Sequence, residues 1–380
     1  QAFEECEERI FKLLGREINL GSSAQLADAL EEKGMIGEWQ LTAKGNRSVS
    51  KDNLPLAIKD KNMLSLILYR SAMHTCLATF IKPWIDKSAA DGRLHPNWNQ
   101  VRSTEGKRKG TRTGRLSSDD PNFQNVPNEF EFPIPDGLRD MPKLRSYLLP
   151  ESEHHTWVKR DFSSQEIRVL AHFSEGALAS AFNSNPKLDP HVLARDIIKE
   201  MTGTGYTRKQ CKETGFGIIY GMGGPGLSKR LGIDVPEAYE LIAAYKNAMP
   251  EVAMLQKGTQ ARGYGGGCIT TWGGRPYYTE PPSGDRSFEY KLLNYLIQGS
   301  AADQTKQCII DWWADKHTDS WTFLATVHDE INISVPTEQV KYGMRHLKES
   351  MNQPLFDVPM LSEGFTGANW GEMKEYADLS

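Results

Sequence analysis

The sequence predicts an α+β fold in which helices fill the first quarter and strands further along carry acidic residues. Three observations support this prediction. A long helical pattern covers residues 56–88, a short strand ends near Asp161 and runs into a helix, and two alternating strands lie within residues 321–335. Apolar residues spaced three or four apart predict helices, whereas strict alternation predicts strands. The 380 residues, of which 39% are hydrophobic, are enough for two or three subdomains.

The first quarter of the chain has helical patterns with recognisable ends. Residues 2–14 are amphipathic and stop at Gly15, and either Ser22 or Ser23 can cap a second helix. The long pattern that follows is carried by Leu64, Ile67, Leu68, Ala72 and Leu77. Residues 91–150 are rich in Pro, Gly and Asn, which predicts loops.

A further helix should begin at Arg208, because Thr207 and Gln210 form a capping-box pattern. Arg208, Lys212 and Phe216 then fall on one stripe of that helix. Two cations in the opening turns face the positive end of the helix dipole, which disfavours them. A triphosphate would remove that conflict, so the pattern favours an anion site. The alternative is a solvated basic helix start above a buried aromatic ring.

Acidic residues lie at the ends of predicted strands that are far apart in the sequence. Residues 158–161 form a strand that ends at Asp161, and the turn between the two later strands contains His328, Asp329 and Glu330. Acidic residues at a hairpin tip are commonly just turn residues. Two carboxylates that a fold brings together repel each other, however, and a pair of divalent cations relieves that repulsion.

Five segments together resemble the motifs of the family A DNA polymerases, the bacterial DNA polymerase I family with its phage and organelle relatives. Residues 161–168, Asp-Phe-Ser-Ser-Gln-Glu-Ile-Arg, are similar to Asp-Tyr-Ser-Gln-Ile-Glu-Leu-Arg. Residues 208–221 match Arg-x3-Lys-x3-Phe-Gly-x2-Tyr-Gly, and residues 327–330 match Val-His-Asp-Glu. Residues 113–127 resemble Thr-Gly-Arg-Leu-Ser-Ser-x-x-Pro-Asn-Leu-Gln-Asn-Ile-Pro, and residues 294–303 resemble Asn-x3-Gln-Gly-Thr-Ala-Ala-Asp. Five motifs in this order are far more specific than any one of them.

The resemblance implies a right-hand polymerase fold with a helical thumb, an antiparallel-sheet palm and helical fingers. Residues 1–105 would form the thumb, with a basic loop at its end. Residues 106–185 would form the first part of the palm, residues 186–289 the fingers, and residues 290–380 the second part of the palm. The match runs from about residue 20 to the end of the chain.

The implied activity is template-directed DNA synthesis by two-metal nucleotidyl transfer from a deoxynucleoside triphosphate to a primer 3′-hydroxyl. By this resemblance Asp161 and Asp329 bridge two Mg²⁺ ions, with Mn²⁺ as a substitute, and the Phe162 carbonyl is a further ligand. Glu330 would help to orient the metal site or the primer end. Hard oxygen donors without a Cys or His cluster favour these ions over zinc.

The nucleotide site implied by the resemblance consists of Arg208, Lys212, Phe216, Tyr220, Glu166 and His191. Arg208 and Lys212 would contact the triphosphate, and Lys212 would also protonate the leaving pyrophosphate. His191 would lie near the β- and γ-phosphates, Phe216 against the sugar and base, and Tyr220 near the templating base. Glu166 would fill the space of a ribose 2′-hydroxyl, and Phe216 would disfavour dideoxynucleotides.

Contacts with primer–template DNA are implied for Arg115, Gln124, Asn125, Arg275, Asn294, Gln298 and His328. Several of these can donate to the minor groove, where every base pair offers a similar acceptor. His328 would contact the primer terminus, and Arg275 the template strand. A basic loop leads into this region and contains Arg102, Lys107, Arg108, Lys109, Arg112 and Arg115 against the single acid Glu105. We expect it to contact duplex phosphates, the alternative being a solvated loop.

Composition limits the remaining possibilities. The net charge of −4 does not indicate a DNA-binding protein, so the local clusters carry that prediction. Five scattered cysteines without a Cys-x-x-Cys pair predict reduced thiols and an intracellular location, in a bacterial or phage-infected cell or an organelle. No apolar run approaches the ~20 residues of a membrane span, and a monomer is expected.

The residues after Asp161 depart from the family pattern, because Ser164 and Gln165 replace the usual Gln-Ile before the acid. This favours a phage or other divergent branch. We expect no 3′–5′ exonuclease domain in this chain; a proofreading domain would lie upstream of residue 1 in the parent protein, which could also bind a replication partner. Two rival functions remain: a metal-dependent nuclease and a catalytically inactive polymerase-like DNA-binding module. The nucleotide helix opposes the first rival, and the presence of Asp161 and Asp329 opposes the second.

Overall fold

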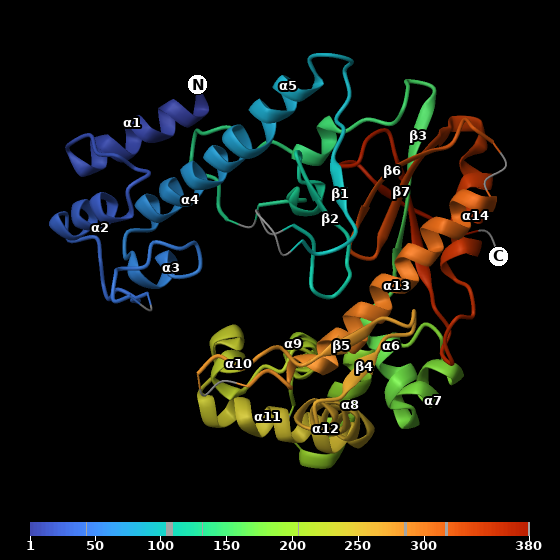
Figure 1. The fold of residues 1–380 in the computed structure, drawn as a ribbon. Coiled ribbons are helices and arrows are strands. Elements are labelled where there is room, and N and C mark those ends of the chain that lie inside the picture. The colour runs from blue at the N-terminus through green and yellow to red at the C-terminus, as the bar shows by residue number, and fades with distance from the viewer. Residues whose placement is uncertain are drawn as a thin grey trace. The chain divides into compact units, whose positions relative to one another are not determined.

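The computed structural model describes residues 1–42, 44–103, 109–130, 132–203, 205–284, 287–315 and 318–378 (Figure 1). The chain divides into two compact units. Gln1–Pro96 and Asn125–Leu148 make up the first, and Asn97–Gln124 and Leu149–Ser380 make up the second. These limits differ from the expected boundaries, since the segment 125–148 belongs with the N-terminal helices.

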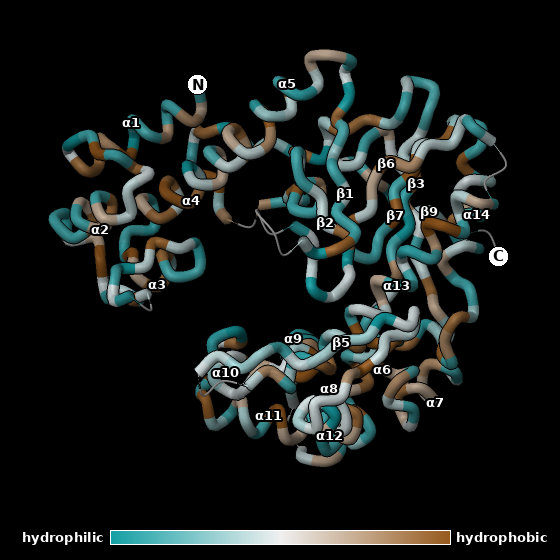
Figure 2. Tube along the Cα trace, in the orientation of Figure 1, coloured by the Kyte–Doolittle hydropathy of each residue, from teal (hydrophilic) through white to brown (hydrophobic). Residues whose placement is uncertain are grey.

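The first unit is helical. Its elements are α1 (Ala2–Leu14), α2 (Ser23–Glu32), α3 (Leu54–Ala57), α4 (Lys61–Thr75), a π-helical segment (Cys76–Ile81), α5 (Lys82–Ser88) and a short 3-10 turn (Leu144–Tyr147). As predicted, α1 stops where Gly15 adopts a φ of 70°, a conformation that glycine takes without strain. Ser22 caps α2 by accepting the backbone N–H of Gln25. Hydrophilic and hydrophobic stretches are interspersed along α1 and α2, in keeping with amphipathic helices (Figure 2).

The long helical pattern predicted over residues 56–88 is interrupted at its start. Asp60 accepts the backbone N–H of Met63 at 2.9 Å and caps a new helix. The helical run Lys61–Ser88 proves long and apolar enough to cross a membrane by length and composition, contrary to expectation. Met63 and Tyr69 are nevertheless fully buried in the core of the unit. One such helix does not establish a membrane span, because core helices of soluble proteins pass the same test.

The second unit is built around an antiparallel five-stranded sheet with the order β6-β7-β3-β8-β9. Its strands are β3 (His155–Phe162), β6 (Thr322–Val327), β7 (Glu330–Pro336), β8 (Ser362–Gly367) and β9 (Lys374–Tyr376). Two small ribbons pair β1 (Asn97–Asn99) with β2 (Ser117–Asp119) and β4 (Cys268–Thr270) with β5 (Pro276–Tyr278). β3 is therefore the central strand, and the predicted hairpin β6–β7 lies beside it (Figure 1).

Helices complete the second unit. They are α6 (Gln165–Ser174), α7 (Gly176–Ser184), α8 (Pro190–Thr202), α9 (Arg208–Ile219), α10 (Gly224–Leu231), α11 (Val235–Ala248), α12 (Pro250–Tyr264), α13 (Lys291–Asp315) and α14 (Val340–Met351), with 3-10 turns at Phe123–Asn125 and Thr337–Gln339. One continuous core joins the sheet to these helices through residues such as Val158, Leu293 and Trp312. The mixture of helices and antiparallel sheets confirms the predicted α+β class.

Candidate active site

The fold brings the two predicted metal-binding carboxylates together at the ends of adjacent strands of the sheet. Asp161 pairs with Glu330 in the register between β3 and β7, and Asp329 directly precedes β7. The backbone N–H of Phe162 donates to the carbonyl of Asp329 at 3.2 Å, so the two strand ends are adjacent. The turn depends on His328, which adopts a φ of 58°. This left-handed conformation is unusual for a residue with a side chain and is found where the surroundings impose it.

The electrostatics of the two carboxylates indicate a cation site. Burial, together with the charges of Asp329 and Glu330, raises the pKa of Asp161 to about 7. Burial likewise raises the pKa of Asp329 to about 6, with Glu166 and Glu330 adding to the rise while a backbone hydrogen bond and Arg115 oppose it. Each acid is therefore destabilised in its charged form, which a divalent cation would reverse.

Glu330 is occupied by protein partners. Lys159 forms an ion pair with one of its carboxylate oxygens at 3.0 Å, and Asn332 donates to the other at 3.0 Å. The Glu330 side chain is almost fully buried. Its charge thus contributes to the field at Asp161 and Asp329, while both of its oxygens are already bound.

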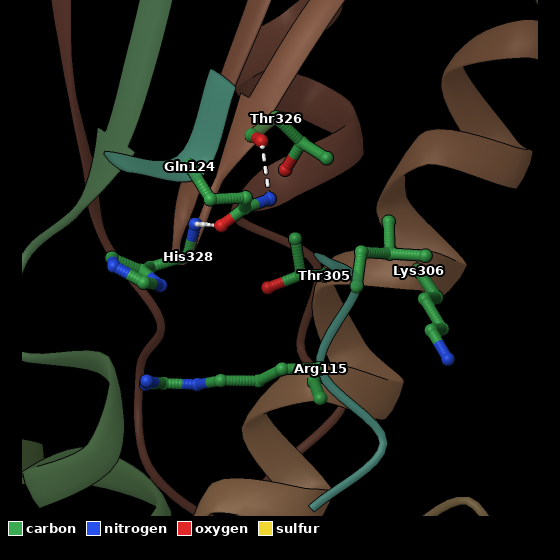
Figure 3. A pocket seen from close by; sticks show the side chains of 8 residues that line it. Arg115, Gln124, Thr305, Lys306, Thr326 and His328 are labelled. Atoms are coloured by element: carbon green, nitrogen blue, oxygen red, sulfur yellow. Dashed lines mark hydrogen bonds between the residues drawn. The ribbon is translucent and has the colours of Figure 1, made fainter. Parts of the chain in front are cut away.

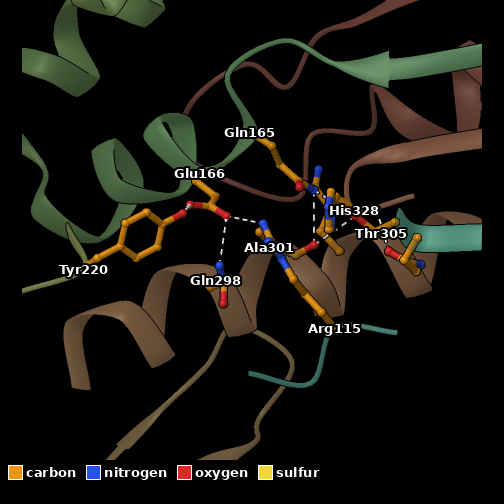
Figure 4. A network of polar contacts seen from close by, with 10 residues as sticks. Arg115, Gln165, Glu166, Tyr220, Gln298, Ala301, Thr305 and His328 are labelled. Carbon is orange, nitrogen blue, oxygen red and sulfur yellow. Dashed lines mark hydrogen bonds and ion pairs between the residues drawn. The ribbon is translucent and has the colours of Figure 1, made fainter. Parts of the chain in front are cut away.

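The carboxylate of Glu166 is contacted by donors from three other segments (Figure 4). The hydroxyl of Tyr220, just beyond α9, donates to it at 2.7 Å, and Arg115 forms an ion pair with it. The Gln298 amide on α13 reaches it at 3.5 Å. These contacts join a predicted nucleotide residue, Glu166, to the predicted minor-groove donors Arg115 and Gln298.

The turn that carries His328 is held from a separate segment (Figure 3). Gln124 donates through its side-chain nitrogen to the Thr326 carbonyl at 2.8 Å and accepts the His328 backbone N–H at 3.4 Å. Together with Arg115 and Lys306, these side chains line a small pocket beside α13. Gln124 therefore supports the acidic hairpin.

Helix α9 begins at Arg208 with the predicted capping box, in which Thr207 and Gln210 exchange hydrogen bonds. Arg208 and Lys212 are exposed on its opening turns. At 1.5 Å per residue, Arg208 lies about 18 Å along the helix from Tyr220. The cationic end and the Glu166 end of this helix are thus well separated, and no contact among the described residues joins Arg208 or Lys212 to Asp161.

Aromatic rings follow Arg208 and Lys212 along the same stripe of α9. The rings of Phe216 and Tyr220 stack with centroids 6.1 Å apart, and His191 on α8 lies 5.9 Å from Phe216. Burial lowers the pKa of His191 to about 4, and the charges of Arg208 and Lys212 add to that shift. His191 is therefore neutral at pH 7, and it can donate a hydrogen bond from only one ring nitrogen.

Packing against a neighbouring helix explains why a glycine stands at position 215 inside α9. A Cβ at this position would lie 2.7 Å from the Tyr245 hydroxyl, which reaches the helix from α11. Tyr245 is itself buried in the core. The glycine thus permits close approach of α11 at the expense of helix propensity, and the helix remains continuous through it.

Two predicted DNA contacts lie near the β4–β5 ribbon and on α13. Arg275 forms an ion pair with Asp303 at 2.6 Å, and its guanidinium packs directly against Gly114 and leaves no room there for a Cβ. Asn294 on α13 has a buried carbonyl oxygen with no hydrogen-bond partner among the described residues. That unpaired acceptor is unusual in a folded protein.

The basic loop is only partly described. Lys107 and Arg108 lie outside the described residues, as does Glu105. Lys109 forms an ion pair with Asp119 at 3.1 Å, and Arg112 pairs with the carboxylate of Glu280. Both of these cations therefore already have acidic partners within the protein. Asn125, predicted to contact DNA, belongs to the first compact unit.

Several supporting residues were missed by sequence reasoning. Gln165 is buried, and its side-chain nitrogen lies within hydrogen-bond reach of the Ala301 carbonyl and of Gln304 and Thr305, which ties α6 to α13 (Figure 4). Asp189 caps α8 and also binds Arg208. Its position before Pro190 is the usual cap signal, but the contact with Arg208 depends on how the two helices pack.

The available ligands fit Mg²⁺, which takes few ligands from the protein, better than a metal ion that is coordinated by protein side chains alone. No group of three or more His, Cys, Asp or Glu side chains within the described part of the chain could hold a metal ion. Mg²⁺ commonly uses one or two carboxylates and takes its other ligands from waters and substrate phosphates. Asp161 and Asp329, with their raised pKa values, match that pattern.

A family model described as DNA polymerase family A matches residues 1–372. DNA polymerase I of Bacillus subtilis is 31% identical over 385 residues, which cover 98% of this chain and 42% of that protein. DNA polymerase I of Pseudomonas aeruginosa is 30% identical, covering 96% of this chain and 40% of its own length. The chain therefore spans about two fifths of these curated relatives.

A solved structure shares the fold. It contains the polymerase domain of Pol1 from M. smegmatis in a complex with DNA primer-template and dNTP. The two folds superpose with a TM-score of 0.79 at 26% sequence identity, over 97% of this chain and 64% of that one.

Proposed function

The chain belongs to DNA polymerase family A, and we propose that it is a template-directed DNA polymerase that extends a primer 3′-hydroxyl with deoxynucleoside triphosphates. The observation that carries the proposal is the convergence of Asp161 and Asp329, two half-buried carboxylates with raised pKa values, beside the donors around Glu166. The relatives are much longer than this chain, so the proposal concerns the activity of this part alone.

We propose that Asp161 and Asp329, with the carbonyl of Phe162, hold two Mg²⁺ ions, for which Mn²⁺ can substitute. When bound, such ions activate the primer hydroxyl and stabilise charge on the phosphates. Lys159 and Asn332 keep both oxygens of Glu330 engaged, so Glu330 supports the site through its charge and does not coordinate directly.

In this proposal the nucleotide lies along α9. Arg208 and Lys212 bind the triphosphate at the exposed start of the helix, and Lys212 donates a proton to the leaving pyrophosphate. The neutral ring of His191 lies 5.9 Å from the ring of Phe216 and would hydrogen-bond a phosphate. Glu166, fixed by Arg115 and Tyr220, would exclude a ribose 2′-hydroxyl, so the substrate would be a deoxynucleotide.

The DNA would be held by donors that lie near this carboxylate. We propose that Arg115, Gln298 and Asn294 face the minor groove, where their N–H groups can donate to the acceptor that every base pair offers. His328 would contact the primer end and Arg275 the template. Asn125 and the basic loop would also contact the duplex. We further propose thumb, palm and fingers roles for residues 1–105, for 106–185 with 290–380, and for 186–289, in a monomer located inside the cell and acting in replication or repair.

Primer extension on a primed DNA template, with Mg²⁺ and all four deoxynucleotides, tests the proposal. Wild-type chain should extend the primer according to the template, and Asp329→Asn should lose extension while retaining DNA binding. Asp357→Asn, which changes an exposed acid outside the site, is the matched control and should behave as wild type. A folded, DNA-binding wild type that fails to extend would overturn the polymerase proposal.

A further inference from the structure

We infer that Asp189 is a positioning residue that orients Arg208 toward the triphosphate, an inference that rests on the proposed function. Asp189 is absent from the motifs that suggested the activity. It lies 19 positions before Arg208, at the start of α8, and reaches the start of α9.

The two oxygens of Asp189 have different partners. Oδ1 accepts the backbone N–H groups of His191 at 2.9 Å and Val192 at 3.2 Å, which caps α8. Oδ2 accepts the Nε–H of Arg208 at 2.6 Å. Because the cap fixes the carboxylate to the backbone, Arg208 is bound to an anchored group and not to a mobile side chain.

This contact leaves a defined edge of the guanidinium for a ligand. Arg208 carries five N–H donors in a planar fork, and the bond to Asp189 uses the Nε–H. The hydrogen bonds within the described ranges give its Nη1 and Nη2 groups no protein acceptor, and about half of the side chain is exposed. A free arginine side chain has many rotamers, and ordering it opposes binding. The bond to Asp189 restricts the Arg208 side chain before a phosphate binds.

The same carboxylate arranges the neighbouring phosphate-site residues. It fixes the backbone of His191, whose ring lies next to Phe216. Burial would raise the pKa of Asp189, but the hydrogen bonds from Arg208 and from the two backbone N–H groups hold it below its usual range. Asp189 is therefore charged at neutral pH and remains a strong acceptor for Arg208.

An Asp189→Asn variant separates the capping of α8 from the binding of Arg208. Asn keeps an oxygen for the cap, but its amide nitrogen is a donor and cannot accept from Arg208. We expect the KM for deoxynucleotides to rise about fivefold, equivalent to about 1 kcal/mol, with a smaller change in kcat. Asp189→Ser, which also caps but is too short to reach Arg208, should show the same rise. Asp196→Asn removes a carboxylate paired with Arg195 on the same helix and should leave KM unchanged.

A double-mutant cycle then asks whether Asp189 acts through Arg208. In an Arg208→Ala background, Asp189→Asn should have no further effect on KM. An unchanged KM in both single Asp189 variants would overturn the inference, as would an additive effect in the double variant. A lower KM would also overturn it, because it would show that Asp189 competes with the triphosphate. A wild type that fails to extend primers would instead remove the proposed function on which the inference rests.

Discussion

Replacing Asp161 by Asn should stabilise the metal-free protein while it abolishes primer extension. Burial and the neighbouring acids raise the pKa of Asp161 from 3.8 to about 7, so folding favours its protonated form. The resulting penalty is absent below about pH 4, grows as the pH rises through 7, and is then fully present. Three pKa units correspond to at most about 4 kcal/mol. Because Asp329 shares the repulsion, we expect about 2 kcal/mol at pH 8.

Thermal unfolding in a chelator at pH 8 and at pH 4 measures this effect. Asp161→Asn should melt about 4 °C above wild type at pH 8 and should match it at pH 4. Adding Mg²⁺ should raise the Tm of wild type more than that of the variant, because binding to the folded state stabilises it. Asp357→Asn, which changes an exposed acid outside the site, is the control and should change little. Equal melting of Asp161→Asn and wild type at pH 8 would refute the reasoning.

Three further changes test the packing and the nucleotide site. Gly215→Ala should lower the Tm despite a gain of about 1 kcal/mol in helix propensity, because its Cβ would lie 2.7 Å from the Tyr245 hydroxyl and overpacking costs about 1–3 kcal/mol; a raised Tm would contradict this. Asp378→Asn removes the carboxylate that binds the buried Arg160 through two nitrogens at 2.8 Å, so urea unfolding should show a loss of about 3 kcal/mol, and an unshifted midpoint would count against it. Phe216→Tyr should increase dideoxynucleotide incorporation relative to deoxynucleotides in primer extension, and an unchanged ratio would disprove the proposed sugar contact.

Local signals in the sequence predicted the elements that carry the site. The capping box at Thr207 located the first residue of α9, and the alternation around Asp329 located the β6–β7 hairpin. Both signals are short in range, because a cap or an alternation depends on residues within a few positions. The break before α4 was missed, because the apolar spacing of residues 56–88 continues across it and outweighed the Asp60 cap.

Contacts between distant segments could not be predicted from the residues alone. The ion pair of Arg115 with Glu166 joins positions 51 apart, and the packing of Gly215 against Tyr245 joins two helices. Local patterns do not determine which helix faces another or at what distance. A glycine inside a helix lowers helix propensity, and only the structure shows that Gly215 is where α11 approaches α9.

The shared acceptor at Glu166 constrains how this chain could be engineered or could diverge. A smaller residue at this position would open room for a ribose hydroxyl, but it would also leave the Arg115 guanidinium and the Tyr220 hydroxyl without their common acceptor. A variant that accepts ribonucleotides should therefore need a second substitution at Arg115 or Tyr220 to recover its fitness. If Glu166 excludes the ribose hydroxyl as proposed, sugar selectivity in this chain would be an epistatic trait, in which the first mutational step is costly and the order of steps matters.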